Sequence, residues 1–208
     1  LERLGVCREH PYETEEGQTL GLLPRLRHLS VFGGATAPFR FGFFAELAES
    51  LKLETLSLTT HARVAPKMLR EVGLHSHLES LQVYVGEGLR DVSTKGWERL
   101  TRLRKFFLED ASRQSMTPYG LHFLSLLPEL RTLFFNAHWL NDGHIFAMAR
   151  AWPPKLESLT LRHAFGMTEA SVPHLRTLLP QLQYLWLNDT GIPWKICEQL
   201  HSEVPETL

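Results

Sequence analysis

Large apolar residues recur along the chain in one fixed pattern, at the first, fourth and sixth positions of a short segment. The pattern is clearest in "LESLTL" at Leu156, and it returns as "LESLQV" at Leu78 and "LETLSL" at Leu53. Side chains of a β-strand point alternately to its two faces, so each segment predicts a short strand with one apolar face. The return of the same phrase predicts a chain built by repetition.

The pattern occurs eight times, and the intervals between copies are 25 to 27 residues. All three positions hold a large apolar residue in every copy. The first positions are Leu1, Leu26, Leu53, Leu78, Leu103, Leu130, Leu156 and Leu182; the fourth are Leu4, Leu29, Leu56, Leu81, Phe106, Leu133, Leu159 and Leu185; the sixth are Val6, Val31, Leu58, Val83, Leu108, Phe135, Leu161 and Leu187. This period is typical of leucine-rich repeats, in which stacked units bury a continuous core that one unit cannot bury alone.

The second half of each unit predicts a helix. After Thr117, a suitable N-cap, Pro118 falls at the first helical position, where its missing N–H costs nothing. Leu121, Leu124 and Leu127 follow at a spacing that suits one buried stripe. Further helices are predicted after Ser93 and Thr94, after Asn141 and Asp142, after Thr168 and Glu169, and in "APKMLREV" (65–72) and "IPWKICEQL" (192–200).

A unit of about 26 residues with a helix opposite its strand resembles the ribonuclease-inhibitor-like and F-box-associated leucine-rich repeats. The segment "LRKFFLEDASRQSMTPYGLHFLSLLPEL" follows that family's order of strand, turn, helix and Pro-x-Leu. The resemblance implies an α/β leucine-rich-repeat solenoid, a horseshoe with a concave parallel β-sheet and convex helices. We expect residues 1–208 to form one such domain. Because the chain starts at Leu1 without a methionine and Leu208 falls where the next copy is due, we expect a fragment of a longer array.

Composition narrows the possible partners. With 22 Lys and Arg against 23 Asp and Glu, the formal net charge is −1, so the chain lacks the basic excess of a phosphate-binding protein. Nucleic acid is therefore not an expected partner. The chain also has no apolar run of about 18 residues, so a membrane is not an expected partner either. The two cysteines, Cys7 and Cys197, make no disulfide framework. A cytoplasmic or nuclear protein is therefore expected.

The third, fifth and seventh positions of each strand are expected to face the concave side of the sheet. Several of them hold aromatic residues, which dominate the energetics of many interfaces. The predicted protein-binding residues are Phe32, Tyr84, Phe107, Glu109, Phe134, Asn136, Arg162 and Trp186. Alternatively, some of these rings cover one another, or Tyr184 and Trp186 lie beneath a further repeat.

Charged residues are expected on the same face: Arg104, Lys105, Glu109, Arg131 and Arg162. Their mixed signs suit a protein partner better than a phosphate backbone. The alternative is an ordinary solvated strand face. A second candidate surface is the segment "GGATAPFRFGFF" after Phe32, whose four phenylalanines cannot all be buried by one helix stripe: Phe39, Phe41, Phe43 and Phe44.

The sequence offers no catalytic constellation. His75 and His77 have the spacing of two metal ligands, but no third ligand is evident. The glycine pairs after the strands form neither a phosphate-binding loop nor a dinucleotide fingerprint. We therefore expect no enzyme activity, no cofactor and no metal.

The resemblance implies a role as the substrate-recognition array of an F-box-type ubiquitin-ligase receptor. A Skp-type adaptor and a cullin would then bind an F-box that is not visible in this sequence. The alternative is a non-catalytic leucine-rich-repeat scaffold subunit of a larger assembly. Capture of an enzyme by the concave face, as an inhibitor, is a further form of protein binding that the sequence does not separate from these.

Overall fold

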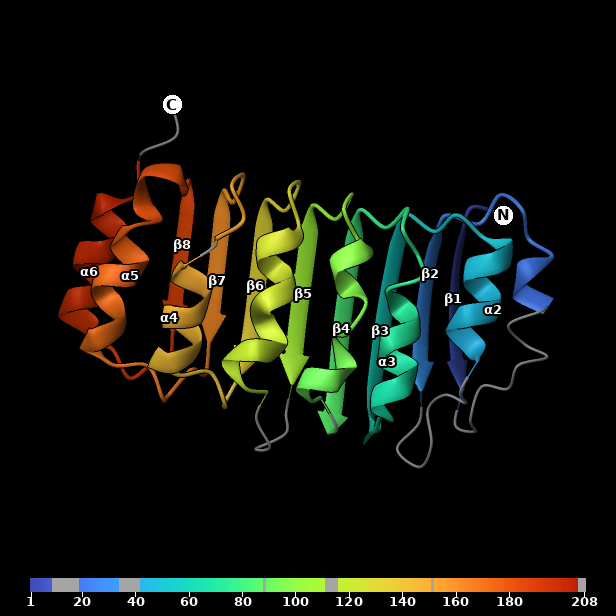
Figure 1. Cartoon of the computed structure of the whole chain (residues 1–208), viewed down its shortest axis with the longest axis horizontal. Helices are drawn as coiled ribbons and strands as arrows, with labels where there is room; N and C mark the ends of the chain where they lie inside the picture. Colours follow the sequence, from blue (N-terminus) through green and yellow to red (C-terminus); the bar gives the residue numbers. More distant parts are fainter. Residues whose placement is uncertain (9–18, 34–41, 88, 111–115, 151, 206–208) are drawn as a thin grey trace.

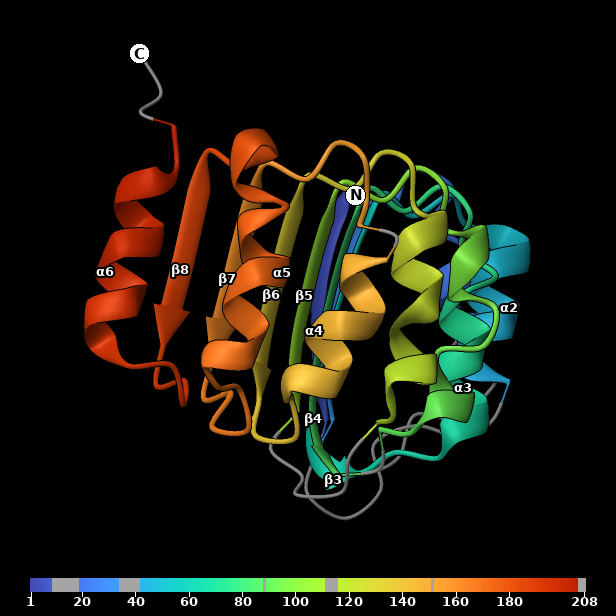
Figure 2. The same ribbon diagram turned by 60° about the vertical axis from the view of Figure 1, so that its left-hand side comes forward.

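The computed structural model describes residues 1–8, 19–33, 42–87, 89–110, 116–150 and 152–205. Eight strands form one parallel sheet in which each strand lies beside its neighbour in the sequence. They are β1 (Arg3–Arg8), β2 (His28–Gly33), β3 (Thr55–Arg63), β4 (Ser80–Glu87), β5 (Lys105–Asp110), β6 (Thr132–Ala137), β7 (Ser158–Arg162) and β8 (Tyr184–Asn188). The helices lie on one face of this sheet (Figure 1), and Figure 2 shows the same two layers from the side of β8.

The register of the sheet follows the repeat. Each fourth-position residue pairs with the fourth-position residue of the next strand, as Leu81 does with Phe106 and Phe106 with Leu133. Backbone hydrogen bonds between repeats also form where the strands begin. There the Glu79 carbonyl accepts from the N–H groups of Arg104 and Lys105. The predicted alignment of the eight copies is thus the strand register itself.

The helical layer mixes α-helices with 3-10 helices. The α-helices are α2 (Phe43–Ser50), α3 (Pro66–Val72), α4 (Asp142–Ala149), α5 (Val172–Arg176) and α6 (Trp194–Glu203). The 3-10 helices are η1 (Asp91–Ser93), η2 (Trp97–Arg99), η3 (Pro118–Leu126), η4 (Glu169–Ser171) and η5 (Leu179–Gln181). The expectation of a full helix in every repeat is therefore wrong for several units.

The predicted cap at Thr117 is confirmed, and Asn141 and Thr168, which precede two other predicted helices, act as caps in the same way. The side chains of Thr117, Asn141 and Thr168 accept hydrogen bonds from backbone N–H groups of the turns that follow them. After Ser93 and Thr94 the predicted helix is reduced to the single 3-10 turn η2. Gly96 has φ of +101° there, a left-handed conformation that stops a right-handed helix, so only the short helices η1 and η2 flank it.

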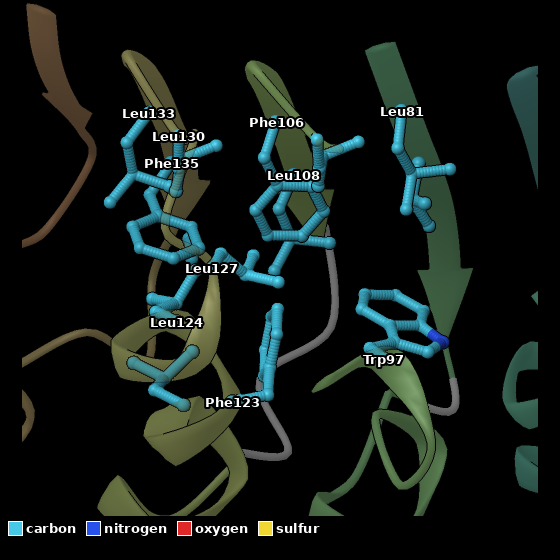
Figure 3. Close-up of a cluster of buried hydrophobic side chains, with 14 of the residues drawn as sticks. Leu81, Trp97, Phe106, Leu108, Phe123, Leu124, Leu127, Leu130, Leu133 and Phe135 are labelled. Atoms are coloured by element: carbon cyan, nitrogen blue, oxygen red, sulfur yellow. The ribbon is translucent and has the colours of Figure 1, made fainter. Parts of the chain in front are cut away.

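The core fills the space between the two layers. Of the 24 apolar positions of the repeat, the 21 in the last seven copies are buried. The first copy, on the edge strand β1, differs: Leu1 is 66% exposed, and Leu4 and Val6 are half-buried. In the middle of the array, Trp97 and Phe123 pack from the helical layer against Phe106 of β5 (Figure 3).

Polar side chains join the helical layers of neighbouring repeats. The Asp91 carboxylate accepts from the N–H and the hydroxyl of Thr117, at 2.6 and 2.5 Å. Asp142 makes the equivalent pair with Thr168, at 2.8 and 2.6 Å. Nearer the N-terminal end of the array, the buried Glu71 carboxylate accepts from the Gly42 N–H at the start of α2, at 2.8 Å. These bonds span 26 to 29 residues of sequence, so they hold one repeat against the next.

His75 makes the stability of the fold depend on pH. Its side chain is 3% exposed, and burial lowers its pKa from 6.5 to about 4, although the backbone of Phe44 opposes this shift. Between pH 6.5 and pH 4, His75 is therefore protonated in the unfolded chain but neutral in the folded chain. We expect the free energy of unfolding to fall by about 3 kcal/mol as the pH is lowered from 6.5 to 4.

Urea unfolding followed by circular dichroism at several pH values measures this effect. The variant His75→Leu removes the titrating group and is expected to flatten the pH dependence by most of that amount. His122→Gln, at an exposed histidine, is the matched control and should keep the wild-type slope. An unchanged slope in His75→Leu would show that other groups carry the dependence.

Candidate functional site

The sheet face opposite the helices is open and carries the third, fifth and seventh positions of each repeat. Along β6, Thr132, Phe134 and Asn136 are half-buried, and the residues between them are fully buried. β5 and β7 show the same alternation. The prediction of which side chains line this concave face is therefore confirmed for these strands.

Two phenylalanines lie side by side at its centre. Phe107 of β5 pairs in register with Phe134 of β6, and their ring centroids are 5.9 Å apart with an interplanar angle of 37°. Each ring is half-buried by the other and by the strands. The alternative that rings on this face cover one another is thus correct for part of their surface. The remainder forms an apolar platform about two strands wide.

A row of polar side chains runs beside the two rings, two residues further along each strand. It is made of the seventh-position residues Tyr84, Glu109, Asn136, Arg162 and Asn188. Asn136 Nδ2 donates to Glu109 Oε1 at 2.9 Å. Arg162 is half-buried, and its Nε is buried without a hydrogen-bond partner among the described residues. Such a donor gains from a ligand that supplies an acceptor.

A hollow of about 250 Å³ lies next to the platform. Phe107, Tyr84 and Glu109 line one part of it, and the short side chains Ser57 and Thr59 of β3 line another. The hollow exists because β3 presents small residues where β4 to β6 present large ones. It offers room for one apolar side chain of a partner beside the Phe107 ring.

The predicted site residues separate into one group and two outliers. Tyr84, Phe107, Glu109, Phe134, Asn136 and Arg162 occupy the adjacent strands β4 to β7. We call these six residues the central patch. Phe32, 43% exposed, lies two strands away on β2, and Trp186, 61% exposed, lies on β8 beside Tyr184. Trp186 and Tyr184 line a separate hollow with His201 of α6.

Two charged residues expected on this face are engaged elsewhere. Arg104 and Arg131 lie just before β5 and β6, where they pair with Glu79 and Glu157 of the neighbouring repeats. They belong to a ladder of ion pairs at that end of the strands. The charge of the central patch therefore comes from Glu109 and Arg162.

A further cluster escaped the sequence reasoning. At the turns after β6 and β7 the rings of His138, His163 and Phe165 stack with centroids 5.5 to 5.9 Å apart. His163 Nδ1 also lies 3.3 Å from the carboxylate of Asp189. His163 and Asp189 both have positive φ, so strained turns hold this pair. Periodicity gives no signal for it, because the contacts join three different turns.

The helical side carries a cleft that the sequence also did not predict. Its cavity of about 470 Å³ lies between η3 and α4. Tyr119, His122 and Ser125 line one wall at the three-residue spacing of a 3-10 ridge, and Gly143 and Ala147 line the other. Small residues on α4 open the cleft, and spacing three in "YGLHFLS" is the signal that could have found it.

Among the described residues, no three His, Cys, Asp or Glu side chains come together as a metal site would require. No helix in that part of the chain is long and apolar enough to cross a membrane. Both cysteines are free. In the second candidate surface, Phe43 and Phe44 are buried in the core with ring centroids 5.0 Å apart, whereas Phe39 and Phe41 lie outside the described residues.

Eight parallel strands in sequence order, each joined to the next through a helical layer on one face, define an α/β leucine-rich-repeat solenoid. The sequence matches no protein-family model and no curated protein. Among solved structures, the chain is similar to TLR13 in the crystal structure of the TLR13–ssRNA13 complex, with a TM-score of 0.55 and 21% identity. The likeness covers 92% of this chain and 26% of that one. It establishes the fold, and the ribonuclease-inhibitor-like or F-box-associated subtype stays a prediction.

Proposed function

We propose that this chain is a protein-binding module whose contact surface is the central patch. The observation that carries the proposal is the platform of Phe107 and Phe134, flanked by the half-buried pair of Glu109 and Asn136 and by the unpaired Arg162 Nε. Apolar rings next to polar groups that lack full partners are typical of interface centres. The rigid sheet beneath holds them in place.

Charge favours a protein over a nucleic acid, even though TLR13 was crystallised with ssRNA13. Binding to a phosphate backbone draws on several clustered Lys and Arg residues. On the described part of the third, fifth and seventh positions, the Lys and Arg residues are Arg3, Lys105 and Arg162, on three different strands. Glu109 lies on the same strand as Lys105 and in the same row as Arg162, and it would repel phosphate.

We further propose that the module is the substrate-recognition array of an F-box-type ubiquitin-ligase receptor in the cytoplasm or nucleus. The period of about 26 residues and the resemblance to F-box-associated repeats support this role. An F-box elsewhere in the parent protein would bind a Skp-type adaptor and a cullin. A scaffold subunit, bound permanently in a larger assembly, is the second candidate, and the same face would serve it.

Truncating both rings of the platform is expected to weaken binding of the protein partner about 30- to 1,000-fold, because interface aromatics contribute about 2–4 kcal/mol. The experiment places a photo-crosslinking amino acid at Gln82, beside the hollow, and captures partners of the parent protein for mass spectrometry. The comparison is wild type against Phe107→Ala/Phe134→Ala. Tyr119→Ala, which removes an 87% exposed ring on the helical side, is the matched control.

A partner that crosslinks to wild type and to the control but not to the double variant supports the central patch. A partner retained by all three proteins would place the contact elsewhere. Recovery of a Skp-type adaptor and a cullin from all three would support the ligase role. A fixed set of other subunits, without these two, would favour the scaffold.

A further inference from the structure

The central patch carries two opposite charges at a defined separation. Glu109 is on β5 and Arg162 is on β7, in register at the same position of their repeats. Neighbouring strands are about 4.8 Å apart, so the two side chains start about 10 Å apart across the strands. The platform of Phe107 and Phe134 runs parallel to this line, about 7 Å away along the strands.

Neither charge is paired with an opposite charge among the described residues. One oxygen of Glu109 accepts from Asn136, and no ion pair joins Glu109 to the described residues. The Arg162 side chain has no hydrogen bond or ion pair with any of them either, and its Nε is shielded from water. A half-buried carboxylate and a half-buried guanidinium call for a cation and an anion of the partner, respectively.

The separation discriminates between secondary structures of the partner. In an extended segment, side chains on one face are about 6.6 or 13 Å apart, and neither value matches 10 Å. In an α-helix, residues i and i+7 lie on one face and are separated by about 10.5 Å along the axis. A helix that runs across the strands would thus place two such residues over Glu109 and Arg162.

The apolar features fit the same occupant. A helix lying along the polar row turns its next stripe of side chains toward the platform about 7 Å away, which is within its diameter of about 10 Å. One apolar side chain of that stripe would enter the hollow beside Phe107 and Ser57. This is the way in which amphipathic helices bind apolar grooves through residues at i, i+3, i+4 and i+7.

We propose that the partner segment bound by the central patch is an amphipathic α-helix, lying across β4 to β7, with a basic and an acidic residue seven positions apart. The basic residue pairs with Glu109 and the acidic residue with Arg162, while the apolar stripe contacts Phe107 and Phe134. This inference rests on the proposed protein-binding function and specifies its partner.

The test uses a displayed library of helical peptides of about 20 residues with a fixed leucine stripe. Two positions, four or seven residues apart, vary among Lys, Asp and Ala. Wild type is expected to enrich peptides with Lys and Asp seven apart about tenfold over those with two alanines, the factor that about 1.4 kcal/mol supplies. A spacing of four, about 6 Å, should confer no such gain.

Charge-reversed proteins sharpen the experiment. Glu109→Lys leaves two cations in the patch, so it should select two acidic residues seven apart. Arg162→Glu leaves two anions and should select two basic residues. Glu198→Lys, at an exposed position of α6, is the matched control and should select as wild type does. Circular dichroism and thermal unfolding verify that each variant is folded.

If enrichment does not depend on charge or spacing but disappears in Phe107→Ala/Phe134→Ala, the proposed pairing with Glu109 and Arg162 is wrong. The protein-binding function would still be supported. No enrichment on wild type would overturn the helical occupant, and the crosslinking experiment then decides the function independently. Selection that follows the sign of residues 109 and 162 would support both.

Discussion

The variant Trp97→Ala is expected to lose about 3–5 kcal/mol of unfolding free energy, the largest effect of any single substitution considered. Trp97 is fully buried, and its ring packs edge-to-face against Phe106 and Phe123 at centroid distances of 5.7 and 5.5 Å. Its Nε1 donates to the Leu69 carbonyl of the preceding repeat at 2.7 Å. Alanine leaves both a cavity and an unsatisfied buried carbonyl.

Urea unfolding followed by circular dichroism measures this loss, and two variants separate its parts. Trp97→Phe keeps most of the apolar volume but removes the N–H, so it should cost about 1–3 kcal/mol. Trp194→Ala removes a ring that is 68% exposed and should change stability by less than about 0.5 kcal/mol. Equal losses in Trp97→Ala and Trp194→Ala would contradict the packing described for Trp97.

The second large effect is expected at Asp142, which joins the sixth and seventh repeats. Its carboxylate accepts from the N–H and hydroxyl of Thr168 and from the hydroxyl of the fully buried Ser171. Asp142→Ala removes the acceptor of all three hydrogen bonds and leaves the buried Ser171 hydroxyl without this acceptor. We expect a loss of about 2–3 kcal/mol, since hydrogen bonds to charged groups contribute more than neutral ones.

The pH dependence of Asp142 has a definite sign. Partial burial tends to raise its pKa, but the hydrogen bonds from Ser171 and Thr168 outweigh this and hold the pKa below the ordinary value of 3.8. The folded state therefore favours the carboxylate. Its contribution is full above pH 3.8 and is lost as the pH falls through the lowered pKa.

Unfolding experiments on Asp142→Asn and Glu169→Gln test this assignment. Asp142→Asn retains the shape but not the charge, so it should lose most of the stabilisation at neutral pH and less as the pH falls below 3.8. Glu169 is exposed in the adjoining turn, and its neutralisation should have little effect. A loss in Asp142→Asn that stays constant down to the lowest pH would mean that the charge plays no part.

Both substitutions act on the array that carries the central patch. In a solenoid each repeat contacts only its neighbours, so stability is close to a sum of repeat and interface terms. Trp97 lies in the core beneath β4 and β5, whereas Asp142 holds the repeats of β6 and β7 together through their helical layer. Loosening either pair would shift Glu109 or Arg162 relative to the two rings.

The sequence alone predicts the strand positions and their register. It also indicates where the helical segments begin, at the caps Thr117, Asn141 and Thr168. These features follow from local periodicity and from side chains that bond to nearby backbone, and such effects act within one repeat. The composition of the concave face was readable for the same reason, because alternation along a strand assigns each side chain to one face.

Contacts between repeats were not readable, because they depend on how residues about 26 positions apart meet in space. A predicted helix is interrupted at Gly96 and forms 3-10 turns instead. Arg104 pairs with Glu79 of the preceding repeat, and the rings of Phe107 and Phe134 partly cover each other. The unpaired Nε of Arg162 is equally a product of its surroundings. Period and pattern thus establish the solenoid, whereas the packing of one repeat on the next determines which side chains remain available to a partner.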